Sequence, residues 1–298
     1  MPNEKAHRLS PAESSTFSLM LPSISTVTFY SGEPPIAFLR SRVGDIVTKN
    51  PWLQGRLVNR KGGLHLVCST EPNLSCFALS EDSTLSEGLE YSVLCARLNK
   101  LAVKKGNQCV DKDECLFRVI VIVTSPSRFA VFVSFSHILG DGYTFYEIYG
   151  MLGEKSTPRA LIFERVSDPE SDRIITQKFD GVHWIQSVGT FINIIWTLLF
   201  RRVTATVHSI EPAWIEQEKA AHKAAGEKLI STNDVLASWF FRLVGCGVGL
   251  MAVNLRGRFP HFTADHAGSA PAAYVLAIAA ITPIGADSEP DSPSRPSR

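Results

Sequence analysis

A histidine, an aspartate and a glycine lie close together in residues 134–142, which read SFSHILGDG. His137 and Asp141 stand four positions apart, and Gly142 follows directly. Random placement of the same residues gives about 0.02 such triplets in a chain of this composition. A histidine held near an acid is a common way to mount a general base. The alternative is a purely structural role, in which His137 is a hydrogen-bonded histidine in a core hairpin and Asp141 serves as a turn or helix cap.

Regular elements flank this motif on both sides. Residues 128–135 are apolar and alternate like a buried strand, and residues 115–123 (CLFRVIVIV) form its expected hairpin partner. The ten residues 143–152 are expected to begin a helix. His137 is therefore predicted to emerge where an apolar hairpin ends.

The segment before this hairpin has its own start and stop signals. Residues 25–30 (STVTFY) predict a strand, and apolar positions spaced near 3.6 predict a helix over 36–49 that Pro51 ends. Gly62 and Gly63 indicate a hairpin turn between 55–60 and 64–68. Residues 1–16 are polar and are expected to be loose.

The second half of the chain predicts further helices and one strand. Residues 211–224 predict a polar helix, and Ser231 with Asp234 predicts a capping box at the start of the next one. Residues 247–255 (GVGLMAVNL) predict a strand that ends at Arg256. Tryptophans are assigned to the core: Trp184, Trp196 and Trp239. Hairpins mixed with helices indicate an α+β fold.

Composition narrows the class of protein. The 298 residues are 45% hydrophobic and 20% charged, with a net charge of +1, which gives no electrostatic case for nucleic acid or acidic lipid. The 6 cysteines form no Cys-x-x-Cys pair, and the histidines show no metal-ligand spacing. No apolar leader follows Met1, so we expect a reducing, cytoplasmic setting.

One apolar run, residues 188–200 (VGTFINIIWTLLF), is shorter than the roughly 20 residues of a membrane span. A buried core helix is favoured over membrane contact, which stays open as the alternative.

Three segments in the same order resemble one family. They are residues 50–57 (NPWLQGRL), the His137-x-x-x-Asp141-Gly142 motif, and residues 231–239 (STNDVLASW) followed by 253–258 (VNLRGR). These are similar to the chloramphenicol-acetyltransferase-like acyltransferases, which include plant BAHD acyltransferases and peptide-synthetase condensation domains.

The resemblance implies two half-domains, each with a mixed sheet, and an active-site tunnel between them. His137 would act as general base on a hydroxyl or amine that attacks a thioester, with acyl-CoA as co-substrate and no permanently bound cofactor. Asp141 would pair with a second-half arginine, Arg256 first and Arg258 second, and Gly142 would permit a tight turn. A surface charge is the alternative for Arg256.

Ser231 and Thr232 would line the acyl-donor channel by the same resemblance, although helix capping explains them as well.

The family's late Asp-Phe-Gly-Trp-Gly motif is missing, and the similarity stops near Gly268. The expected organisation is an acyltransferase half-domain at 17–165, a crossover at 166–210, a partial second half at 211–283 and a disordered tail at 284–298. The alternative function is that of a truncated, inactive family member that acts as a binding protein or is a remnant.

Overall fold

The computed structural model describes residues 4–11, 13–69, 71, 73–164, 189, 192, 196, 200, 207–226, 230–244, 249–252, 254, 256–257, 262–268 and 276–279. The chain divides into two compact units. Unit 1 comprises Met1–Ile175, Arg202–Val207 and Asn254–Tyr274, and unit 2 comprises Thr176–Arg201, His208–Val253 and Val275–Arg298. The half-domain boundaries expected from the sequence stay a prediction.

Unit 1 contains two sheets. A mixed four-stranded sheet has the order β2-β7-β6-β5, in which only β5 and β6 are parallel neighbours. A three-stranded antiparallel sheet has the order β1-β4-β3. The strands are β1 (Glu4–Arg8), β2 (Ile24–Ser31), β3 (Arg56–Arg60), β4 (Gly63–Ser69), β5 (Phe77–Glu81), β6 (Phe117–Ser125) and β7 (Arg128–Phe135).

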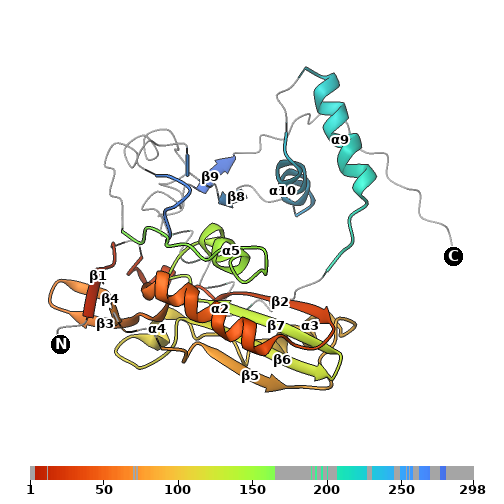
Figure 1. Cartoon of the computed structure of the whole chain (residues 1–298). Coiled ribbons are helices and arrows are strands. Elements are labelled where there is room, and N and C mark those ends of the chain that lie inside the picture. Colours follow the sequence, from red (N-terminus) through yellow and green to blue (C-terminus); the bar gives the residue numbers. More distant parts are fainter. Residues whose placement is uncertain are drawn as a thin grey trace. The chain divides into compact units, whose positions relative to one another are not determined.

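Short and medium-length helices connect these strands. They are α1 (Thr16–Met20), α2 (Ile36–Lys49), the 3-10 helix η1 (Pro51–Gln54), α3 (Tyr91–Leu98), α4 (Gly106–Cys109) and α5 (Gly142–Gly150). Helix α2 lies across one face of the four-stranded sheet (Figure 1).

Both faces of the four-stranded sheet are covered, and its central strands, β6 and β7, are apolar at most of their positions. On one face, Val131 and Val133 of β7 pack in the cluster that contains Val43 and Ile46 of α2. On the other face, Phe132 packs in a second cluster with α3 and its flanking loops. The continuous apolar run of β6 and β7 is what a strand covered on both faces requires.

The predicted hairpins and the helix over 36–49 are confirmed, and so is the hairpin turn at Gly62 and Gly63. The prediction of a loose N-terminus is wrong for Glu4–Arg8, which pairs with β4 as an edge strand. The side chains of this strand are mostly exposed, so side-chain pattern gives no signal there. Main-chain hydrogen bonds to the open edge of β4 form the strand instead.

Unit 2 contains α9 (Pro212–Ala224), α10 (Thr232–Leu243) and the antiparallel pair of β8 (Gly249–Ala252) and β9 (Leu276–Ala279). The helix expected over 211–224 and the strand expected within 247–255 are thus both present. The core assignment is wrong for Trp196 and Trp239, whose side chains are 60% and 39% exposed. A spacing near 3.6 identifies a helical face but not what covers it.

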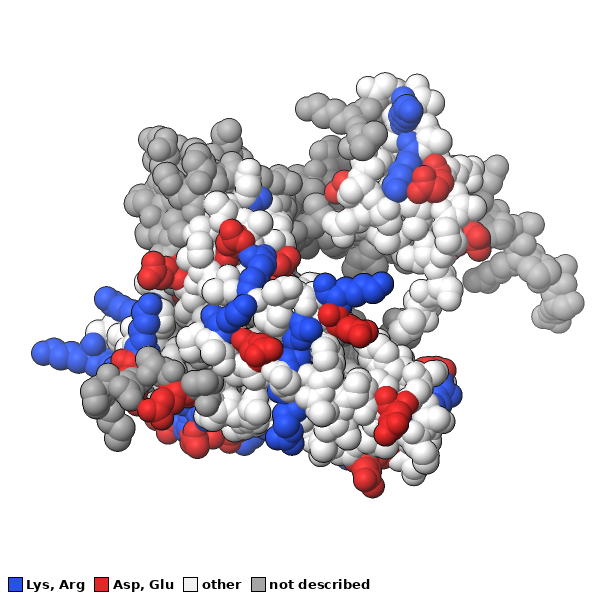
Figure 2. Space-filling model, viewed as in Figure 1, with Lys and Arg blue, Asp and Glu red and all other residues white. Residues whose placement is uncertain are grey.

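Several expectations lie outside the described residues: Trp184, Arg258, most of the crossover at 166–210 and the tail at 284–298. Within the described part of the chain, no helix is long and apolar enough to cross a membrane. Figure 2 shows acidic and basic side chains interspersed on the displayed face, in keeping with the net charge of +1. The fold is α+β, as the sequence predicts.

Candidate functional site

His137 lies in the turn that follows β7, and the neighbouring residues hold this turn in place. Ser136 donates its backbone N–H to the carbonyl oxygen of Leu116 at 2.8 Å, and the next two side chains, Ile138 and Leu139, are 2% and 0% exposed. The imidazole itself is half-buried. The two buried side chains anchor the turn and thereby fix the position of the His137 backbone, from which the imidazole projects.

Burial lowers the pKa of His137 below its ordinary value, and the charge of Asp141 opposes this effect less strongly. Desolvation disfavours the protonated form of histidine. The ring is therefore neutral at pH 7 and can accept a proton. Among the described residues the ring has no hydrogen-bond partner, and it does not line two cavities of about 520 and 530 Å³ that described residues of unit 1 form.

Asp141 has two roles at once. Its side chain caps α5, accepting hydrogen bonds from the backbone N–H of Thr144 at 2.9 Å and from the Thr144 hydroxyl at 2.8 Å. Its carboxylate also pairs with Arg256, whose Nη1 lies 2.7 Å from Oδ2 and whose Nη2 lies 3.2 Å from Oδ1. The ion pair and the helix cap, which the sequence left as alternatives, therefore coexist.

Arg256 is buried, with a side chain only 2% exposed. Besides Asp141, it donates to the carbonyl oxygens of His266 at 2.8 Å and Gly268 at 2.9 Å, and to Asn254 Oδ1 at 3.2 Å. Its guanidinium carbon lies 4.3 Å from the Tyr143 ring centre and 4.7 Å from that of Phe262. A buried cation requires such complete pairing because its desolvation is costly. The surface-charge alternative for Arg256 is thus wrong.

Thr144 completes this network and was not singled out by the sequence. Its fully buried hydroxyl accepts from Arg256 Nη2 at 3.2 Å and from the Gly268 backbone N–H at 3.0 Å, while it donates to Asp141. The only available signal was its place three residues after a capping aspartate, where a capping box has its second polar residue.

The glycine that this site requires is Gly140 rather than Gly142. Gly142 begins α5, and a Cβ there would meet no described atom within 4 Å. A Cβ on Gly140 would lie 2.9 Å from Cβ of Thr144. The expectation of a tight turn at Gly142 is therefore corrected: close packing under the Arg256 network excludes a side chain at Gly140.

Ser231 and Thr232 lie in unit 2, at the start of α10. Ser231 is the N-cap of a capping box with Asp234, which confirms the predicted cap. The hydroxyl of Ser231 is 2.7 Å from Asp234 Oδ2, and this bond is the main reason that the pKa of Asp234 is lowered. A donor-channel role for Ser231 and Thr232 stays a prediction. In the described ranges no group of histidine, cysteine and carboxylate side chains could hold a metal ion.

Solved structures similar to this chain include condensation domains. The first condensation domain of the calcium-dependent antibiotic synthetase, in complex with a substrate analogue, shares 14% identity over 89% of this chain and 68% of its own, with a TM-score of 0.52. A variant starter condensation domain of rhizomide synthetase in complex with C8-CoA shares 15% identity over 88% and 63%, with a TM-score of 0.49. A condensation domain of the enacyloxin polyketide synthase shares 18% identity over 83% and 51%, with a TM-score of 0.45.

The chain spans about half to two thirds of the length of these structures. No family model and no curated protein matches the sequence. At these identities the similarity concerns the fold alone. The fold of this chain is that of the condensation domains, which is the chloramphenicol-acetyltransferase-like fold.

Proposed function

We propose that this chain is an acyltransferase that moves an acyl group from a thioester, acyl-CoA, to a hydroxyl or amine. His137 is the general base, and Asp141 and Arg256 are positioning residues. The observation that carries this proposal is the difference between the two motif side chains. Asp141 forms an ion pair with Arg256 and a hydrogen bond with Thr144, while the neutral His137 ring has no hydrogen-bond partner among the described residues.

The chemistry follows from a neutral imidazole. A ring nitrogen of His137 takes the proton from the acceptor O–H or N–H as the nucleophile attacks the thioester carbonyl carbon. Collapse of the tetrahedral intermediate breaks the carbon–sulfur bond, and the imidazolium returns its proton to the departing thiolate. Histidine suits both steps because its ordinary pKa lies near 6.5.

The choice of acyl-CoA as donor rests on the resemblance of residues 50–57, the motif and 231–239 to the acyltransferase family, which implies a thioester donor. Ser231 and Thr232 are the residues proposed along the donor channel.

The test compares the wild type with His137→Ala in transfer from a set of acyl-CoA donors to mixed alcohol and amine acceptors. His65→Ala, in β4 and outside the motif, is the matched control. Loss of a general base is expected to lower kcat by about 100- to 10,000-fold, with the control unchanged. Equal rates for the wild type and His137→Ala refute the assignment.

A second candidate is a binding protein without acyltransferase activity. It is favoured by the apolar side chains on α10 that remain open to solvent, since Phe240 and Leu243 are 52% and 66% exposed. Large exposed apolar side chains often mark an association surface. A monomer in sedimentation that turns over acyl-CoA excludes this candidate.

A further inference from the structure

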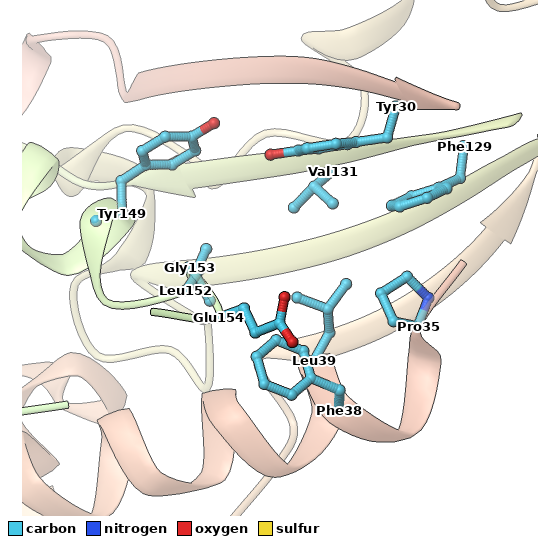
Figure 3. A pocket seen from close by; sticks show the side chains of 11 residues that line it. Tyr30, Pro35, Phe38, Leu39, Phe129, Val131, Tyr149, Leu152, Gly153 and Glu154 are labelled. Atoms are coloured by element: carbon cyan, nitrogen blue, oxygen red, sulfur yellow. The ribbon is translucent and has the colours of Figure 1, made fainter. Parts of the chain in front are cut away.

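Unit 1 contains an aromatic cavity of about 520 Å³ that is separate from the His137 motif. It is bounded by the paired strands β2 and β7, by the start of α2, and by the end of α5 with the segment that follows it. Its walls are formed by Tyr30, Pro35, Phe38, Leu39, Phe129, Val131, Tyr149, Gly150, Leu152, Gly153 and Glu154 (Figure 3). A volume of this size is typical of small-molecule sites.

Ring faces dominate one part of the lining. Tyr30 and Phe129 are stacked, with centroids 5.1 Å apart, and Val131 behind them is only 4% exposed. The hydroxyl of Tyr149 is hydrogen-bonded to Thr28, and the Tyr30 and Tyr149 hydroxyl groups point toward each other in Figure 3. Burial raises the pKa of Tyr30, and the neighbouring Tyr149 raises it further by a smaller amount, so this phenol stays uncharged. The aromatic wall therefore offers π faces without a charge of its own.

Glu154 supplies the charge of the cavity. It is the one charged residue among the described lining residues, and its carboxylate lies beside Phe38 and Leu39 in Figure 3. Within the described chain this carboxylate has no ion-pair partner. The nearby Arg42 donates instead to the backbone carbonyls of Glu154 and Ser156.

The C-terminal end of α5 adds partial negative charge to that of Glu154. Tyr149 and Gly150 are the last residues of this helix, and its final turn carries no basic side chain. Partial negative charge collects at a helix C-terminus and favours a cation there. A cation is therefore attracted by three features of this cavity: the Glu154 carboxylate, the C-terminus of α5 and the aromatic ring faces. Ammonium ions in particular bind over aromatic faces.

We propose that this cavity binds a small amphiphilic amine: its apolar body packs against Tyr30, Phe38 and Phe129, and its ammonium group pairs with Glu154. The site is independent of acyl transfer, since His137 does not line it.

The test uses three probes of nearly equal shape: phenylbutylamine, phenylbutanol and phenylbutyrate, each titrated calorimetrically at pH 7. We expect the amine to bind about tenfold more tightly than the alcohol, and the carboxylate to bind most weakly. Equal affinities, tighter binding of the carboxylate, or no binding of the amine overturns the proposal. Tighter carboxylate binding would show that Arg42 sets the charge preference.

Variants locate the site. Glu154→Gln is expected to reduce the affinity for the amine to that for the alcohol and to leave the alcohol unchanged. Phe38→Leu is expected to weaken all three probes. Glu33→Gln is the matched control, because this exposed carboxylate lies two residues before Pro35 of the cavity wall but does not line the cavity itself. An unchanged preference for the amine in Glu154→Gln, or an equal loss in Glu33→Gln, refutes the assignment of Glu154. His137→Ala is expected to bind the amine as the wild type does.

Discussion

The ion pair between Asp141 and Arg256 can be tested without removing the helix cap. In Asp141→Asn the asparagine caps α5 about as well as aspartate, so the change isolates the charge. Arg256 is then left as a buried cation without its counterion, since its side chain is 2% exposed and that of Asp141 is 26% exposed. Breaking a buried pair by removing one partner costs about 3–5 kcal/mol.

We expect a loss near the lower end, about 3 kcal/mol, because Asp141 is partly exposed and Arg256 keeps its other acceptors. Of the six hydrogen bonds that the Arg256 side chain makes to described residues, four go to Asn254, Thr144, His266 and Gly268. A chain with two compact units need not unfold in one step, so a single transition is not assumed.

The measurement is urea unfolding, with hydrogen exchange of the β6 and β7 amides reporting on unit 1. Glu90→Gln is the matched control, because Glu90 also caps a helix with its carboxylate but is exposed and pairs with no arginine among the described residues. Its effect should be much smaller. The double variant Asp141→Asn with Arg256→Met should recover part of the loss, because no unpaired charge then stays buried. A loss below about 1 kcal/mol in Asp141→Asn contradicts the structural role assigned to the pair.

Four further changes have defined outcomes. The pKa of His137 is lowered in the folded state, so the unfolded chain binds more protons just below pH 6.5 and stability falls as pH drops through this window; His137→Gln should show a smaller fall in urea midpoint between pH 7 and pH 5. Gly140→Ala should cost about 1–3 kcal/mol in urea unfolding because its Cβ would press on Thr144, whereas Gly142→Ala should be neutral or stabilising by up to about 1 kcal/mol; equal effects contradict the packing argument. Gly55→Ala should destabilise by about 1–3 kcal/mol, since its Cβ would lie 2.6 Å from a buried leucine of β4, and an unchanged thermal midpoint refutes this.

Local sequence patterns predicted the elements that have a strong hydrophobic periodicity or clear capping and turn residues. The apolar runs of β6 and β7, the helix over Ile36–Lys49 and the capping box of α10 could all be identified without a structure. Each is encoded in neighbouring residues, where side-chain period and capping chemistry operate. The edge strand β1 was missed because its partner lies about 60 positions away and its side chains are mostly exposed.

The candidate site shows the same division. Residue types and spacing singled out His137 and Asp141, and the family resemblance pointed to Arg256. Only the tertiary structure placed Thr144 and Gly268 on the same guanidinium group, because Thr144 lies more than 100 positions before both Arg256 and Gly268.

The sequence by itself determined the α+β class, the hairpin behind His137 and the polar residues of its motif, since these depend on local propensity and spacing. Only the tertiary structure decided which glycine must lack a side chain, which aromatic rings cover Arg256, and that Glu154 is the one charged residue among the described residues of an aromatic cavity. Those properties arise from packing between distant segments, and no local pattern records them.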